Sequence, residues 1–134
     1  MPYRDIIDEA GGEYVGFDRI SLPANVSSQD RGPDNPLQYR WDAVICTQVI
    51  QYVPHPDLWL DDIRRALKPG CPLLLTGPTN WPIVEFEDRW RYTPTGIGSL
   101  LNNTGFYVEE VAPRAVVEHN GENWLLGWGA VARG

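Results

Sequence analysis

The sequence predicts an α/β fold whose sheet is mainly parallel. Strand and helix patterns alternate through the middle of the chain, the order that places parallel strands beside one another. The run WDAVICTQ, residues 41–48, is apolar on both faces, as expected of a parallel strand covered by helices on each side. The last two strand patterns have no helix between them, so we expect an antiparallel hairpin at one edge of the sheet.

The N-terminal region predicts one short helix and one strand. Residues 3–10 have a helical pattern that two consecutive glycines should end, because glycine readily adopts the left-handed conformation that follows many helices. The run EYVGFD, residues 13–18, predicts a buried strand that ends in an acid. Proline and glycine then interrupt residues 19–40, so we expect a loop there, with at most a short strand near residues 24–28.

A second helix and a third strand are predicted in the middle of the chain. The helix should begin at Pro56, because proline is tolerated in the first helical turn. Leu60, Ile63 and Leu67 recur at spacings of three and four residues and mark its buried stripe. A Lys-Pro-Gly run should end the helix, and residues 72–76 predict a further strand, parallel to the earlier ones.

The C-terminal third predicts a helix and then the hairpin. Thr93 should cap a helix that has proline at its first position and runs to about residue 103. Residues 106–111 should pair antiparallel with residues 125–132 across a polar turn.

Composition favours one globular domain over residues 1–134. Hydrophobic residues make up 43% and charged residues 22%, which excludes a disordered chain. The net charge of −7 argues against nucleic-acid and anionic-membrane partners. Cys46 and Cys71 are expected to be free thiols, and the scattered His and Cys residues predict no metal site. Since no long apolar run or signal-peptide pattern occurs, we expect a cytoplasmic location.

The run WDAVICTQVIQYVPHPDLWLDDIRRALKPGCPLLLTGP, residues 41–78, carries a family resemblance. It resembles the middle of class I S-adenosylmethionine-dependent methyltransferases of the small-molecule type often labelled methyltransferase type 11. In that family, a strand that begins with an aromatic residue and Asp precedes a helix ending in LKPGG and an apolar strand. The run DRWRYTPTGIGSLLNNTGF, residues 88–106, resembles a later segment of the family. The resemblance implies a Rossmann-like methyltransferase fold and S-adenosylmethionine as the cofactor.

The resemblance extends to the N-terminal region. The runs PYR, residues 2–4, and YVGFD, residues 14–18, match those that follow the first strand and its glycine-rich loop in relatives. The chain is therefore expected to start after that loop, with the first strand of the sheet missing. Because the backbone N–H groups of such a loop approach the bound cofactor closely, we expect the chain alone to be impaired as an enzyme.

The resemblance also implies a set of cofactor-binding residues. Asp18 would accept hydrogen bonds from the ribose hydroxyls, and Phe17 and Arg19 would flank the adenine. Thr47 and Gln48 end the strand at which relatives contact the cofactor. The alternatives are a strand-end acid that caps a turn at Asp18 and simple packing for the other residues.

Four residues are expected to bind a small-molecule methyl acceptor: Tyr52, Trp90, Arg91 and Tyr92. Tyr52 follows Gln51 at the position where many relatives carry Glu-His, so no catalytic acid or base is assigned. The other three lie in an aromatic and charged segment after a strand, where the sites of α/β proteins lie. The alternative is a surface loop anchored by its aromatic side chains.

Two functions remain open at this point. One is methyl transfer to a small molecule, and the other is a non-catalytic methyltransferase-like module for binding or assembly. An NAD-type dinucleotide domain is less favoured because of the closing hairpin and the LKPGC run. Strand edges left unpaired by the missing strand predict a homodimer or a partner that supplies that strand. Trp90, Trp124 and Trp128 are candidates for the buried surface of the homodimer.

Overall fold

The computed structural model describes residues 3–16, 41–83 and 87–134, which belong to two units, Met1–Asn35 and Pro36–Gly134. The first unit contains helix α1, Arg4–Glu9. This helix confirms the predicted N-terminal helix, and Gly11 follows it with a φ of 78°, as expected of a glycine that ends a helix. The prediction of one domain over the whole chain stays a prediction.

The strand predicted for residues 13–18 is not formed over its described part, and residues 17–18 lie outside the described residues. Residues 13–15 are in no strand, and Gly16 forms only an isolated bridge. The predicted loop at residues 19–40 and its short strand also lie outside the described part of the chain. Within the first unit, the guanidinium of Arg4 lies 5.3 Å from the ring centre of Tyr14. This cation–π contact joins the helix to the residues that follow it.

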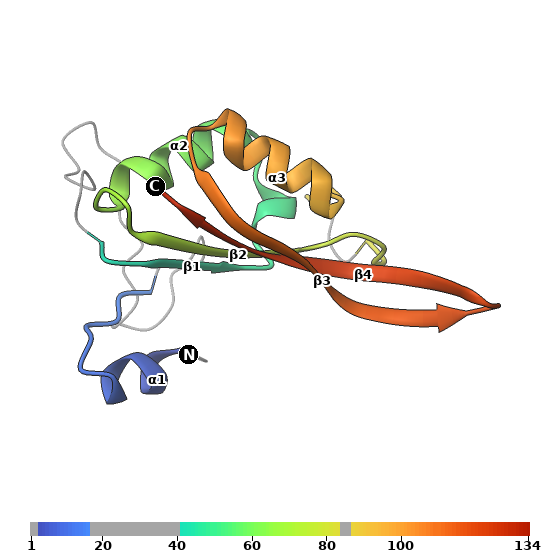
Figure 1. Ribbon diagram of the computed structural model, residues 1–134, viewed down its shortest axis with the longest axis horizontal. Coiled ribbons are helices and arrows are strands. Elements are labelled where there is room, and N and C mark those ends of the chain that lie inside the picture. The colour runs from blue at the N-terminus through green and yellow to red at the C-terminus, as the bar shows by residue number, and fades with distance from the viewer. Residues whose placement is uncertain (1–2, 17–40, 84–86) are drawn as a thin grey trace. The chain divides into compact units, whose positions relative to one another are not determined.

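The second unit is built on a four-stranded sheet (Figure 1). In their order across the sheet, its strands are β1 (Val44–Thr47), β2 (Pro72–Pro78), β4 (Glu122–Arg133) and β3 (Tyr107–His119). β1 and β2 are parallel, whereas β4 is antiparallel to both of its neighbours. The predicted hairpin is confirmed, with β3 as the edge strand of the described sheet.

The prediction of a mainly parallel sheet is wrong for the described strands. One pairing is parallel, between β1 and β2, and the pairings of β4 with β2 and with β3 are antiparallel. Of the strands that pair with each other, only β1 and β2 are joined by a helical connection, which returns the chain to the same end of the sheet. The tight turn between β3 and β4 forces these strands to run in opposite directions, and β4 then adds a second antiparallel contact by pairing with β2.

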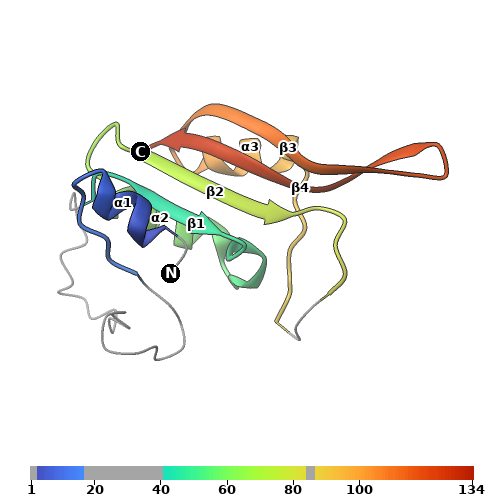
Figure 2. The ribbon, with the colours of Figure 1, turned by 90° about the horizontal axis from the view of Figure 1, so that it is seen from below.

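Two helices lie on the same face of this sheet (Figures 1 and 2). α2, Pro56–Ala66, joins β1 to β2 after the single turn η1, Ile50–Tyr52. α3, Pro94–Asn103, precedes the hairpin, and its cap Thr93 accepts a hydrogen bond at Oγ1 from the backbone N–H of Gly96 at 3.1 Å. Both helix starts are as predicted. No helix within the described residues is long and apolar enough to cross a membrane.

The core lies between the sheet and these two helices. Alternate side chains of β2 and β4 point toward the helices, as the two-residue period of a strand requires. The predicted stripe of α2 is confirmed, because Leu60 and Leu67 are buried and Ile63 packs against the core. The buried side chains that β2, β4 and α3 contribute are Leu73, Leu75, Ile97, Leu101, Trp128, Ala130 and Ala132.

Trp128 is part of this core, so the prediction that it contributes to a dimer surface is wrong. Its side chain is only 1% exposed, because it shares the helix-covered face of β4 with Ala130 and Ala132. Across the β2–β4 ladder its register partner is Gly77. A Cβ at Gly77 would lie 2.5 Å from Cζ2 of the indole, closer than carbon atoms can approach. Because β2 has a glycine at this position, the large side chain on β4 fits against it.

We predict that Gly77→Ala destabilises the protein by about 1–3 kcal/mol, the usual cost of overpacking a core. Urea unfolding followed by circular dichroism measures this loss. Gly98→Ala in α3 is the matched control, because a Cβ there meets only Val111 Cγ2 at 3.7 Å. This control should be more stable by about 0.5–1 kcal/mol, since alanine favours a helix over glycine. Equal stabilities for the two variants would contradict the close contact at Trp128.

Candidate functional site

Two loops meet the carboxyl ends of the parallel strands β1 and β2. The chain leaves β1 through Gln48, whose φ of 57° is left-handed, and enters η1 directly. It leaves β2 at Pro78 and runs through residues 79–93 to α3. In open α/β sheets, ligands bind in the crevice outside the carboxyl ends of the strands. These two loops therefore form the candidate site.

Two polar side chains lie at the end of β1. Thr47 is half-buried and Gln48 is exposed, and the backbone N–H of Gln48 donates to the carbonyl of Thr76 at 3.1 Å. The side-chain Nε2 of Gln48 lies 3.5 Å from Oγ1 of Thr76. These contacts hold the strand end against β2 while the hydroxyl and amide groups stay accessible.

Gln51 joins the two loops from a buried position. Its side chain donates through Nε2 to the carbonyl of Gln48 at 3.0 Å. Its backbone carbonyl accepts hydrogen bonds from the backbone N–H groups of Arg89, at 2.7 Å, and Trp90, at 3.2 Å. The residue is 4% exposed, and its Oε1 has no hydrogen-bond partner in the described part of the chain. Sequence reasoning treated Gln51 only as a departure from a family pattern, although a glutamine inside the apolar run VIQYV was a signal for a buried polar role.

Trp90 and Tyr92 form an aromatic pair beside this junction. The indole N–H of Trp90 donates to the carbonyl of Val53 at 2.7 Å, which fixes the ring against the loop after β1. The rings of Trp90 and Tyr92 are stacked, with centres 6.4 Å apart and planes at 28°. Burial, with a smaller effect from the charge of Asp57, raises the pKa of Tyr92 above its ordinary value. The Tyr92 hydroxyl therefore stays protonated at neutral pH and can donate a hydrogen bond.

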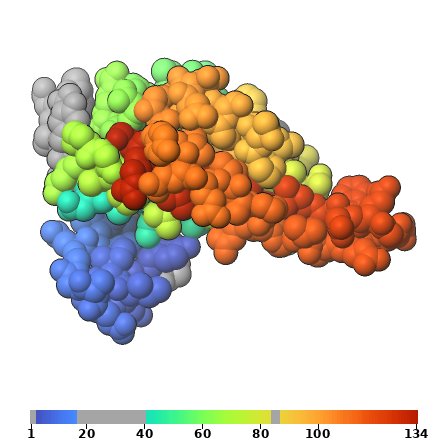
Figure 3. Space-filling view, viewed as in Figure 1, coloured from blue at the N-terminus to red at the C-terminus, as the bar shows by residue number. Residues whose placement is uncertain are grey.

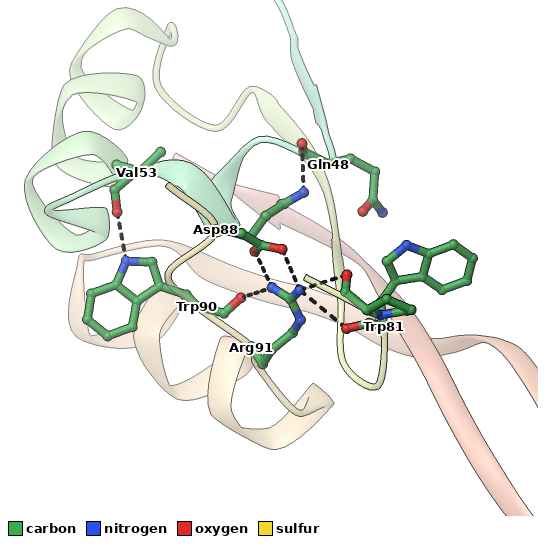
Figure 4. A network of polar contacts seen from close by, with 8 residues as sticks. Gln48, Val53, Trp81, Asp88, Trp90 and Arg91 are labelled. Atoms are coloured by element: carbon green, nitrogen blue, oxygen red, sulfur yellow. Dashed lines mark hydrogen bonds and ion pairs between the residues drawn. The ribbon is translucent and has the colours of Figure 1, made fainter. Parts of the chain in front are cut away.

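Arg91 is engaged with its own loop (Figure 4). Its Nη2 donates to Oδ2 of Asp88 at 2.6 Å, and its Nη1 pairs with the other carboxylate oxygen. The same guanidinium donates to the carbonyls of Trp81 and Pro82, at 3.4 Å each, and of Trp90, at 2.9 Å. We call this set of contacts the Arg91 clamp. The Asp88 side chain is 1% exposed, and its hydrogen bond raises the pKa of Arg91.

The structure brings six of the predicted site residues to the two loops. Thr47 ends β1, Gln48 and Tyr52 follow it, and the segment Trp90, Arg91 and Tyr92 follows β2. The hydrogen bonds of the Arg91 guanidinium are made within its own loop. Its predicted contact with an acceptor stays a prediction. The remaining predicted residues, Phe17, Asp18 and Arg19, lie outside the described residues. Among the described residues there is no group of His, Cys, Asp and Glu side chains suited to a metal ion.

We predict that Asp88→Ala destabilises the protein by about 1–3 kcal/mol, because it leaves the Arg91 guanidinium without its buried carboxylate. Urea unfolding measures the change. The control is Asp42→Ala, which removes an ion pair of 2.6 Å to Lys68 from a side chain that is 82% exposed. That variant should lose much less stability than Asp88→Ala, as exposed ion pairs contribute little. A loss at Asp88 no larger than the loss at Asp42 would contradict a structural clamp.

Cys46 is predicted to resist alkylation in the folded protein. It packs against the core, and burial raises the pKa of its thiol to about 12. At pH 8 such a thiol is ionised in about one molecule in 10⁴, against about one in four for an ordinary cysteine. Mass spectrometry after iodoacetamide treatment should therefore detect modification of Cys46 at least about 100-fold more slowly in the folded chain than in urea. Equal rates would contradict its burial, and a Cys46→Ala variant reports Cys71 alone.

Comparisons with known proteins connect this geometry to one fold. No protein-family model matches the sequence, and no curated protein matches it. Solved structures do match. A SAM-dependent methyltransferase from Archaeoglobus fulgidus superposes with a TM-score of 0.72 and 12% identity, over 98% of this chain and 80% of that one.

Two further structures have the same fold. The 1,6-didemethyltoxoflavin-N1-methyltransferase of Burkholderia thailandensis, solved with 1,6-didemethyltoxoflavin and S-adenosylhomocysteine bound, has a TM-score of 0.68 and 14% identity. The match covers 96% of this chain and 64% of that one. The [4+2]-cyclase SpnF has a TM-score of 0.58 and 18% identity, over 96% of this chain and 60% of that one. The chain therefore has the fold of class I S-adenosylmethionine-dependent methyltransferases.

Proposed function

We propose that the chain is an S-adenosylmethionine-dependent methyltransferase homologue that acts on a small-molecule acceptor. The observation that carries the proposal is the match to a methyltransferase structure over 98% of the chain at a TM-score of 0.72. The position of the candidate site supports it, because the two loops lie at the carboxyl ends of β1 and β2, where α/β folds bind ligands.

The residues at the end of β1 fit a polar cofactor. Thr47 offers a half-buried hydroxyl and Gln48 an exposed amide, and the buried Oε1 of Gln51, three residues further on, has no hydrogen-bond partner in the described part of the chain. Asp18 would accept hydrogen bonds from ribose hydroxyls, and Phe17 and Arg19 would flank the adenine, as the family resemblance implies. When bound, S-adenosylmethionine supplies an activated methyl group, so the protein has to provide mainly position and orientation.

The acceptor would lie against the aromatic side of the site. Trp90 and Tyr92 give an apolar surface that excludes water, and the Tyr92 hydroxyl can donate a hydrogen bond. Tyr52, from the other loop, completes the set, while Arg91 holds the loop that carries Trp90. None of these side chains is an evident general base, which suits an acceptor whose nucleophilic atom needs positioning rather than deprotonation.

We predict that the 134-residue chain binds S-adenosylhomocysteine with a dissociation constant between about 10 μM and 1 mM. The affinity is weak because the sequence before residues 14–18 contains no glycine-rich loop. A titration followed by NMR of the six tryptophan indole N–H signals measures it. Asp18→Ala should weaken binding at least about tenfold, whereas Asp8→Ala, in α1, should leave it unchanged.

The outcomes of this titration separate the parts of the proposal. Saturable binding that Asp18→Ala removes supports the cofactor site. Binding near 1 μM, about −8 kcal/mol, would overturn the expected impairment and favour a competent enzyme. No saturable change at 5 mM ligand, about five times the weakest expected dissociation constant, would overturn the methyltransferase proposal itself.

The second candidate is a non-catalytic module that retains the methyltransferase fold for binding or assembly. It is favoured by the Gln51-Tyr52 pair, which stands where many methyltransferases carry Glu-His. The match to a [4+2]-cyclase adds that this fold by itself does not determine methyl transfer. The titration above discriminates the two candidates.

A further inference from the structure

The hairpin of β3 and β4 extends beyond the rest of the sheet (Figure 3). β2 pairs with β4 only as far as Gly127, and the loop after β2 adds two more backbone hydrogen bonds, to Leu126 and Leu125. Beyond that point β3 and β4 pair only with each other. We call residues 114–126 the hairpin arm. A two-stranded ribbon alone is marginally stable in water, so the arm is a place where further contacts are expected.

The tip of the arm is a well-defined turn. Asn120 and Gly121 join the strands with φ angles of 52° and 78°, the left-handed pair typical of a type I′ turn. Such a turn matches the twist of the strands it connects. The arm therefore projects as an ordered ribbon with a fixed register, in which Val117 faces Trp124 and Val116 faces Leu125.

The arm exposes apolar side chains on both of its faces. Val116 is 53% exposed, Val117 is 42% exposed and Trp124 is 43% exposed. Val117 and Trp124 are register partners and share one face, while Val116 lies on the other face with Leu125. Exposed apolar side chains on an edge strand invite pairing with another chain.

Two charged residues flank Val116 on β3. Arg114 and Glu118 are both exposed, and neither forms an ion pair within the described part of the chain. Their register partners on β4, together with that of Val116, are Gly127, Asn123 and Leu125, which lie on one face of that strand, so all three side chains share a face. An antiparallel copy of β3 aligned about Val116 would place Arg114 opposite Glu118 of the other chain, twice over.

We propose that the arms of two copies of this chain lie antiparallel along β3, centred on Val116, and form a symmetric homodimer. A two-fold contact pairs each residue with its counterpart reciprocally, so the two Val116 side chains meet and two Arg114–Glu118 ion pairs flank them. Opposite charges directly across antiparallel strands stabilise the pairing, and like charges destabilise it. A shift by one residue would instead place Arg114 opposite His119, which removes the complementarity.

Side chains rather than a long backbone ladder carry this contact. Pro113 has no N–H to donate, so it limits backbone pairing at the end of the arm nearest the four-stranded part of the sheet. Ala115 lies within the contact and has a left-handed φ of 52°, which interrupts a regular backbone ladder there. The second copy is the favoured occupant because the charges of the strand complement those of its own antiparallel copy.

Charge exchange tests the proposal. Light scattering after size-exclusion chromatography at 100 μM should give a mass of about 30 kDa, twice the 15.1 kDa of one chain. Arg114→Glu or Glu118→Arg alone should raise the dimer dissociation constant at least tenfold, because each change places two like charges opposite each other across the contact. The double variant R114E/E118R exchanges the partners and should restore the dimer.

The matched control is Glu122→Arg, which makes the same charge change at the tip of β4, away from the proposed contact. It should leave the dimer intact, and circular dichroism verifies that every variant is folded. A wild-type mass of 15 kDa at 100 μM would overturn the proposal and leave the arm to a different occupant. A dimer that the single variants do not weaken, or that the double variant does not restore, would overturn this surface.

Discussion

The contact between Trp128 and Gly77 determines the arrangement of the second unit. The indole fills the space that a Cβ on Gly77 would need, and the two residues are register partners across β2 and β4. A slip by one residue would turn Trp128 to the opposite face and place a side chain against its former position. With this register set, β2 ends opposite Gly127, and the loop that carries the candidate site leaves the sheet at a defined point.

Hydrogen bonds that involve backbone groups join the two loops of the site. The carbonyl of Gln51 accepts two N–H groups from the loop after β2, and the indole of Trp90 returns a bond to Val53. The Arg91 clamp closes the same loop on itself through Asp88 and three carbonyls. The aromatic surface is therefore held in place before any ligand arrives, which is what a reaction that depends on positioning requires.

Local signals in the sequence predicted the helices and the closing hairpin. They did not predict which strands pair in the sheet. Thr93 caps α3 because its hydroxyl is three residues from the N–H it accepts, a relation visible in the sequence. The place of β4 between β2 and β3 depends on residues about 50 positions apart, so no local pattern contains it. Trp128 was assigned to the surface although its alternation with Ala130 and Ala132 marks one face of a strand. The Arg91–Asp88 ion pair spans only three residues, but it falls in a segment with no clean period, so the sequence did not reveal it.

The side chains of β4 are buried at one end of the strand and exposed at the other. Toward its C-terminus, Ala130 and Ala132 lie under the helices, whereas Trp124 near its N-terminus is 43% exposed. The exposed half cannot move independently, because the hydrogen-bonded register that seats Trp128 against Gly77 also positions Val117 opposite Trp124. The core thus supplies the rigidity that an arm of two strands lacks alone. A contact made by the arm could act on the site through the ladder of β4 with β2, and through the backbone hydrogen bonds of Leu125 and Leu126 with the loop after β2.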